Sequence, residues 1–317
     1  MALVDEPPPT AVWLMNMGGP DSLAAIRPFL FRLLNDPDVV HFPVRWLQWA
    51  FALAISILRS RKVRQDYARM GGGSPQLPAV RAQAAALQVV LGTGFECVPV
   101  FRYWGEGADQ ARKQLRSGQP VVLLSLYPHA CGATTVSSIR DCRRALKGHD
   151  GPVHEVASYP DHPGFVAAMR ETIEGVLATL PDDACPDVVF SAHSTPEIWV
   201  SQGDPYLGEI QRTVAAVQKG RQWRSHLCFQ SRVGVTKWLG PSTLDTVARL
   251  GAQGCEHLVL VPIAFTSDHI ETLIELDEQV RDAALAAGVG AFHRVPSLND
   301  RATYIRALGE LTLAATR

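Results

Sequence analysis

One segment of the sequence, 266–278, concentrates side chains that could handle metal ions or protons. It reads TSDHIETLIELDE and places Asp268, Glu271, Glu275 and Glu278 at helical spacing on one side, with no lysine or arginine in that column. Like charges one turn apart destabilise a helix by roughly 0.2–0.5 kcal/mol per pair, so the column indicates a path for a cation or for protons. A plainer interpretation stays open, in which Asp268 and Glu271 form a capping box that begins an amphipathic helix.

His269 and Glu271 could share one metal ion only if this helix is irregular. Two residues apart in an α-helix, side chains diverge by about 200°. They face the same way only where the turn is extended or widened into a π-turn, a feature that favours functional sites. Imidazole and carboxylate together suit Fe²⁺, Co²⁺ or Zn²⁺. The spacing therefore predicts a metal-handling or proton-relay site and does not choose between them.

His193 is a second candidate for chemistry. It ends the apolar run VVFSAH and is followed by Ser, Thr and Pro at 194–196. In open α/β sheets, ligands bind beyond the carboxyl ends of the strands, and a neutral imidazole can accept a proton near pH 7. A packed or surface histidine without function is the alternative on these residues alone.

Short apolar runs alternate with amphipathic helical patterns, which predicts an α/β fold with parallel sheets. Runs such as VVLLSL and LVLVPI are apolar without alternation, as in strands covered on both faces. Eight strands divide into two sheets, with a domain boundary near residue 160 and a ligand cleft between the halves. Strands are expected at 11–17, 97–102, 120–126, 153–157, 187–191, 226–230, 257–263 and 291–295, and helices at 78–91, 108–116, 164–179, 206–217, 241–250 and 270–287.

Composition excludes several classes of protein. The chain has 317 residues, of which 47% are hydrophobic and 19% charged, as expected for about two globular domains. A net charge of −1 gives no basic field for nucleic acid. No two of the six cysteines are closer than eleven residues, so there is no CxxC zinc site. The sequence also lacks GxGxxG, GxxxxGK[ST] and GxSxG motifs, and the glycines at 18–19 and 71–73 are interpreted as tight turns.

The stretch 42–64 has two interpretations. Its charge-free part, 46–58, is 13 residues long, short of the ~20 residues that span a bilayer, and basic residues follow it at 59, 61, 62 and 64. It is either a buried core helix or an exposed apolar lip with a basic edge. Such a lip would suit a flat apolar ligand with carboxylates, or a membrane surface. The first ten residues lack the features of a signal peptide.

The motifs taken together, in this order along the chain, resemble the ferrochelatase family, which inserts ferrous iron into a porphyrin late in haem synthesis. The resemblance covers residues 11–315 and implies the class II chelatase fold, with two Rossmann-like domains at 1–160 and 161–317 around the active site. Its motifs are LMNMGGPDS (14–22), GGGSP (71–75), FRYW (101–104), LYPHACGATTVSS (126–138), FSAHSTP (190–196), GDPY (203–206), FQSRVGVTKWLGP (229–241), VPIAFTSDHIETLIELD (261–277) and SLND (297–300).

The resemblance implies roles for individual residues. His193 and Glu271 match the family's pair that binds the metal and abstracts protons. His269 and Glu275 match an acidic path behind that pair, in a helix that the family widens to a π-turn. The positions that match the porphyrin pocket are Met17, Arg102, Tyr103, Trp238 and Phe265, and those near the propionates are Arg59, Lys62 and Ser74.

The implied reaction is insertion of Fe²⁺ into protoporphyrin IX, which forms protohaem and releases two protons. Alternatives are a coproporphyrin III ferrochelatase, a chelatase for another tetrapyrrole such as a sirohydrochlorin, and a non-catalytic porphyrin or haem carrier. The start LMNMGGP and the stretch FQSRVG…WLGP favour protoporphyrin.

Fe²⁺ is a substrate in this reading, and we expect no required cofactor. A [2Fe–2S] cluster is not expected, because the last cysteine is Cys255 and Cys131 is offset by one residue from the family's upstream cluster cysteine. We expect a cytoplasmic lyase that is a monomer or homodimer. Peripheral contact with the inner membrane through residues 42–64 is left open, and no nucleic acid partner is expected.

Overall fold

Two parallel four-stranded sheets form the centre of the molecule. The computed structural model describes residues 8–40, 42–232 and 236–317, so residues 233–235 of the motif FQSRVGVTKWLGP lie outside the described residues. The sheets have the orders β2-β1-β3-β4 and β6-β5-β7-β8, and all neighbouring strands are parallel. The strands are β1 (Thr10–Gly18), β2 (Phe95–Trp104), β3 (Val121–Ser125), β4 (Val153–Val156), β5 (Asp187–His193), β6 (Arg224–Gln230), β7 (His257–Pro262) and β8 (Ala291–Arg294).

Helices cover both faces of each sheet, which explains the unalternating apolar strands. On the first sheet, α3 (Gln76–Leu91) packs on one face, and α4 (Ala108–Arg112) and α5 (Ser137–Ala145) pack on the other. On the second sheet, α6 (Pro163–Leu177) and α8 (Tyr206–Gln218) face α9 (Thr243–Ala252) and α10 (Arg281–Ala286) across the strands. The predicted α/β class with two parallel sheets is therefore confirmed.

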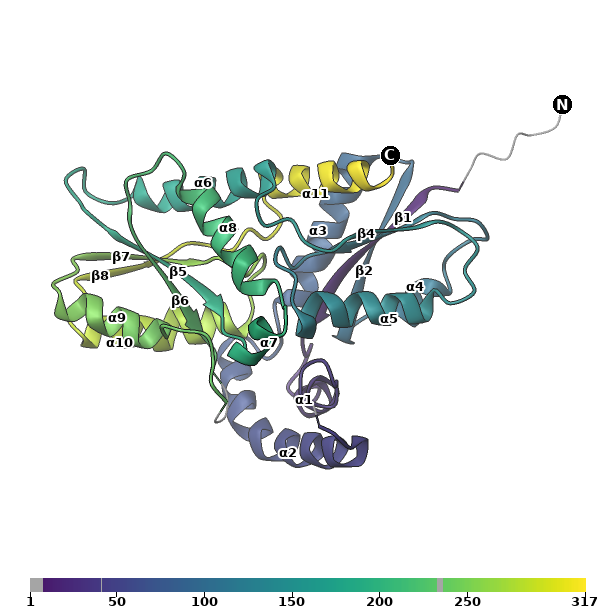
Figure 1. Ribbon diagram of the computed structural model, residues 1–317, viewed down its shortest axis with the longest axis horizontal. Coiled ribbons are helices and arrows are strands. Elements are labelled where there is room, and N and C mark those ends of the chain that lie inside the picture. Colours follow the sequence, from purple (N-terminus) through teal and green to yellow (C-terminus); the bar gives the residue numbers. More distant parts are fainter. Residues whose placement is uncertain (1–7, 41, 233–235) are drawn as a thin grey trace.

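The C-terminal helix links the two halves. In Figure 1, α11 (Ala302–Ala315) lies along the upper side of the molecule, where it packs against both α3 and α6. Its Tyr304 is fully buried, and its hydroxyl lies 2.9 Å from that of Tyr159. One apolar core runs from the first sheet through α11 to the second. The boundary near residue 160 falls between β4 and α6 and stays a prediction, because α11 contacts both sides of it.

Helix α2 (Arg45–Arg69) has its polarity inverted relative to a core helix. Gln48 and Ser56 are buried, whereas Trp46 is 67% exposed and Leu58 is 73% exposed. Figure 1 shows α2, with α1 (Ile26–Leu34), projecting from the lower side of the molecule. The interpretation of 42–64 as a buried core helix is therefore wrong, and the exposed apolar lip is what the structure shows. In the part of the chain that the structure describes, no helix has both the length and the apolar content to cross a membrane.

The segment predicted as one α-helix at 270–287 divides into two elements. Glu271–Val280 forms a π-helix, η2, which continues into α10. The widened turn that the resemblance implies is thus confirmed, and a regular α-helix over 270–287 is not. A second, shorter π-helix, η1 (Gly132–Val136), precedes α5 in the first half.

Candidate active site

His193 lies at the carboxyl end of β5 and has a defined tautomer. Its Nδ1 is 2.5 Å from the carbonyl oxygen of Ser194. Because a carbonyl oxygen only accepts hydrogen bonds, Nδ1 carries a proton, and in the neutral ring Nε2 then keeps the free lone pair. Nε2 lies 3.7 Å from Oε2 of Glu271, which is too long for a hydrogen bond. The two side chains therefore face each other without being bonded.

Neighbouring loops hold the turn that follows His193. The Ser194 N–H donates to the carbonyl of Gln230 at 2.8 Å, and Trp238 pairs with Pro196 in an antiparallel bridge. The structure thus brings Trp238, predicted for the porphyrin pocket, next to the His193 turn. Burial raises the pKa of Tyr206 well above its usual value, and the backbone of His193 opposes this shift, so the tyrosine lies close to the turn. Tyr206 lies in the quoted motif GDPY, but a buried tyrosine at the start of a helix gave no sign of this position.

The π-helix brings the other predicted catalytic residues to His193. Burial lowers the pKa of His269, opposed by the nearby Glu271 carboxylate. Its ring lies against that of Phe265, tilted by 53°, with 4.6 Å between ring centroids. Burial, and then the charge of Glu271, raise the pKa of Glu275, and the nearby His193 opposes this. All four predicted catalytic side chains therefore form one electrostatic cluster. Over residues 8–40, 42–232 and 236–317, no three His, Cys, Asp or Glu side chains are arranged to hold a metal ion.

Two carboxylates of the column formed by Asp268, Glu271, Glu275 and Glu278 have arginine partners. Arg294, which comes from β8, binds Asp268 at 3.1 Å, and Arg69 of α2 binds Glu278 at 3.0 Å. The column itself contains no lysine or arginine, but at these two positions distant elements supply the basic partner. Within the described part of the chain, only Glu271 and Glu275 of the column lack an arginine or lysine partner.

Two turns of the first half pack together and face the π-helix. A Cβ on Gly19 would lie 2.5 Å from the hydroxyl of Ser74, so this contact requires glycine. Ser74 is buried, and Met17 is half-buried next to the same turn. Burial raises the pKa of Tyr67 well above its usual value, and the charge of Glu271 raises it further. Tyr67 therefore lies near Glu271, although a tyrosine within a charged helix gave no sign of this in the sequence.

Arg102 and Tyr103 belong to a buried network around Asp36. The Asp36 side chain, in a residue that is only 4% exposed, accepts hydrogen bonds from Arg102 Nη2 at 2.6 Å, the Tyr103 hydroxyl at 2.9 Å and the Ser137 hydroxyl at 2.8 Å. The loop between α1 and α2 is thereby fixed to the end of β2. Asp36 was missed because NDPD at 35–38 resembles an ordinary turn. The assignment of Arg102 and Tyr103 to a porphyrin pocket stays a prediction.

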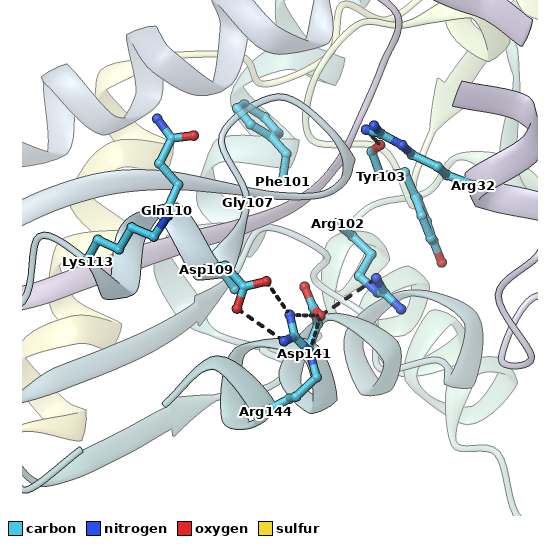
Figure 2. A pocket seen from close by; sticks show the side chains of 11 residues that line it. Arg32, Phe101, Arg102, Tyr103, Gly107, Asp109, Gln110, Lys113, Asp141 and Arg144 are labelled. Carbon is cyan, nitrogen blue, oxygen red and sulfur yellow. Dashed lines mark hydrogen bonds and ion pairs between the residues drawn. The ribbon is translucent and has the colours of Figure 1, made fainter. Parts of the chain in front are cut away.

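A groove of about 540 Å³ lies beside Arg102, on the α4 and α5 side of β2. Figure 2 shows Arg102 and Arg144 both directed at Asp141, and Arg144 also bound to Asp109. Arg32 and Lys113 also line the groove, so its basic side chains outnumber its acidic ones. None of the residues lining it comes from the second sheet or from η2, so the groove is separate from the His193 cluster.

Arg59 and Lys62 lie exposed on α2. Neither side chain forms an ion pair with another residue in the described ranges. Their charges are available to an anionic ligand at the lip, as the resemblance implies. Direct contact with a propionate stays a prediction for both residues and for Ser74.

Comparisons of the sequence with known proteins agree with one another. A family model described as Ferrochelatase matches residues 9–316. A protein named Ferrochelatase from Geotalea uraniireducens is 42% identical over 311 residues, which cover 96% of this chain and 97% of that protein. A protein of the same name from Synechocystis sp. is 38% identical over 316 residues, which cover 95% of this chain and 81% of that protein.

Solved structures share the fold at low sequence identity. SirB from Bacillus subtilis with Fe³⁺ has a TM-score of 0.58 at 10% identity, over 97% of this chain and 95% of that chain. CbiX, described as the terminal enzyme for biosynthesis of sirohaem in denitrifying bacteria, has a TM-score of 0.55 at 12% identity, over 97% of this chain and 99% of that chain. At such identities the likeness shows the fold alone, and it confirms the predicted class II chelatase fold.

Proposed function

The chain belongs to the ferrochelatase family, and on that premise we propose that it is a lyase that inserts Fe²⁺ into protoporphyrin IX, with His193 and Glu271 as the reacting pair. The observation that carries this proposal is the 3.7 Å separation of His193 Nε2 from Glu271 Oε2. A divalent metal ion bound by both atoms at about 2.1 Å would hold them roughly 3–4 Å apart. One ion, or one proton in transit, can therefore reach both side chains.

Metal insertion requires the release of two pyrrole protons, and this cluster offers groups to take them. His193 Nε2 is an acceptor, since Nδ1 donates to Ser194. Burial and the charge of Glu271 raise the pKa of Glu275, so this carboxylate takes up a proton more readily than an exposed glutamate does. We assign the first proton to His193 and the onward path to Glu271 and Glu275, with His269 beside them.

The decisive test is anaerobic Fe²⁺ insertion into protoporphyrin IX and, in parallel, coproporphyrin III, followed by the loss of porphyrin fluorescence. We expect turnover with both and a higher kcat/KM with protoporphyrin IX, because the motifs LMNMGGP and FQSRVG…WLGP resemble members that use it. Heat-denatured protein provides the background rate. A preference for coproporphyrin III would mean that this porphyrin, and not protoporphyrin IX, is the substrate. Tight porphyrin binding without metal insertion would indicate a carrier and contradict the proposal.

We propose that helix α2 contacts the edge of the porphyrin macrocycle and also a membrane surface. Trp46 and Trp49 are 67% and 52% exposed, and basic side chains follow on the same helix. Exposed apolar patches with basic rims are typical of interfacial contacts. Replacing both tryptophans with serine should weaken co-sedimentation with phosphatidylglycerol vesicles about tenfold, or about 1.4 kcal/mol.

Val89→Ser is the matched control for this change, because Val89 is 82% exposed on α3. Equal sedimentation of the wild type and the double variant, or no sedimentation of the wild type, would contradict the membrane contact. A cytoplasmic location, a monomeric or homodimeric state and the lack of a [2Fe–2S] cluster stay predictions. An iron–sulfur absorption band in aerobically purified protein would contradict the last of these.

A further inference from the structure

Among the residues that the structure describes, two adopt a positive φ without being glycine, and both hold the π-helix segment. Asn299 has φ 45° and Ser231 has φ 62°. The Asn299 side chain donates to Asp268, just before η2, at 3.0 Å, and it accepts the Asp268 N–H at 3.0 Å. Asparagine tolerates this left-handed region, whereas serine is seldom found there. Such conformations persist where the surrounding structure enforces them, and they cluster at functional sites.

Ser231 holds both oxygens of one carboxylate. Its backbone N–H donates to Glu275 Oε1 at 2.8 Å, and its hydroxyl donates to Glu275 Oε2 at 2.5 Å. The same hydroxyl oxygen lies 3.3 Å from Glu271 Oε2. In its left-handed conformation, one residue directs its N–H and its hydroxyl to the same side chain. Ser231 is thus the contact that the two glutamates share.

Glu275 needs such a partner because it is half-buried next to a second carboxylate. No arginine or lysine in the described ranges pairs with it, and the charge of Glu271 repels its own charge. Hydrogen bonds to ionised acceptors are roughly twice as strong as neutral ones. The two donors of Ser231 therefore oppose the repulsion and keep both glutamates on one face of η2.

The neighbouring Gln230 extends this contact to His193. Its side-chain amide, held by the hydroxyl of Ser191 at 2.8 Å, donates to the backbone carbonyl of Glu271 at 3.4 Å. Its own carbonyl accepts the N–H of Ser194, the residue after His193. The end of β6 therefore connects the His193 turn to η2, and a shift at Ser231 would change how Glu271 faces His193.

We propose that Ser231 is a positioning residue for metal insertion, which sets the Glu275 and Glu271 carboxylates relative to His193 through its left-handed backbone and its hydroxyl. This inference rests on the proposed function, since it assumes that Glu271 acts together with His193. Ser231 itself need not contact the porphyrin or the iron.

Ser231→Gly is the most informative variant, because glycine adopts this φ readily and keeps the N–H while the hydroxyl is lost. We expect kcat for Fe²⁺ insertion to fall about tenfold, since misplacing a reacting group by 1 Å costs up to about 100-fold. The KM for protoporphyrin IX should stay within about twofold and the Tm should not fall. Ser231→Ala should lose a similar factor in kcat but have a lower Tm than Ser231→Gly, because alanine loses the hydroxyl and still carries the strain of a side chain at this φ.

The matched control is Ser117→Gly. Ser117 also donates its hydroxyl to a carboxylate at 2.5 Å, that of Asp150, but in an exposed turn of the first half. Its kcat should stay within about twofold of the wild type. A normal kcat for Ser231→Gly, or a loss that appears only in KM or Tm, would overturn the positioning role.

A double-mutant cycle with Glu275→Gln separates positioning from a general structural effect. If Ser231 acts through Glu275, adding Ser231→Gly to Glu275→Gln should lower kcat by less than about twofold more. Multiplied losses would show that Ser231 does not act through Glu275 and would overturn the inference. The wild type in the same assay keeps the two ideas apart. If the wild type does not insert iron, the proposed function fails and this inference fails with it. Equal kcat values for the wild type and Ser231→Gly contradict the role of Ser231 alone.

Discussion

Replacing His193 with alanine is expected to lower kcat for Fe²⁺ insertion by about 100-fold or more, the usual contribution of a positioned general base. Nδ1 of this histidine donates to the Ser194 carbonyl, which leaves Nε2 as the acceptor that faces Glu271. Among the described residues, His193 is the histidine that pairs with Glu271, whereas the half-buried His269 has its ring against Phe265. The measurement is the initial rate of porphyrin fluorescence loss under anaerobic conditions.

His257→Ala is the control for this prediction. His257 begins β7, at the end of the second sheet away from the His193 turn, where its Nδ1 lies 3.4 Å from His293 Nε2. Its removal should leave kcat within about twofold of the wild type. A turnover near normal for His193→Ala would remove His193 from the mechanism and leave Glu271 as the remaining base.

Replacing Glu271 with glutamine is the second large effect, and we expect kcat to fall by about 100-fold. Glutamine keeps the shape of the side chain but cannot carry the negative charge that binds a cation or accepts a proton. The charge also acts on its surroundings, since Glu271 contributes to the raised pKa values of Glu275 and Tyr67. The measurement is kcat and the apparent KM for Fe²⁺ in the same fluorescence assay.

Combining the two changes tests whether the residues act as a unit. Residues that serve one step give strongly non-additive losses, so His193→Ala with Glu271→Gln should be only a few-fold slower than either single variant. Asp282→Asn, an exposed change on α10, is the control and should keep its activity. Fully multiplied losses, or a normal rate for Glu271→Gln, would contradict a shared role.

The fold was predictable because its signals are local. Unalternating apolar runs such as those of β3 and β7 are buried on both faces, and this pattern is typical of parallel strands. The π-helix was different. From the residues alone we inferred only that His269 and Glu271 cannot face the same way in a regular helix. The prediction of a widened turn came from the resemblance to the family.

Helix α2 shows where local patterns mislead. A charge-free, mostly apolar stretch of 13 residues, 46–58, fits a core helix as well as an exposed lip. The decision depends on whether another element covers it, and hydrophobicity alone does not contain that information. The structure leaves Trp46 and Leu58 exposed and buries Gln48 instead, with the Gln48 amide donating to the Val40 carbonyl at 2.7 Å.

The sequence by itself determined the α/β class, the strands of the two sheets and the segments that carry the candidate site, because periodicity and motifs depend on residues a few positions apart. Helices α1, α5 and α11 were not predicted. Only the tertiary structure decided which charges have partners. Asp36 meets Arg102, Asp268 meets Arg294 and Glu278 meets Arg69, each across a long stretch of chain. A carboxylate changes its role when an arginine from a distant element packs against it, and that packing is a property of the whole fold.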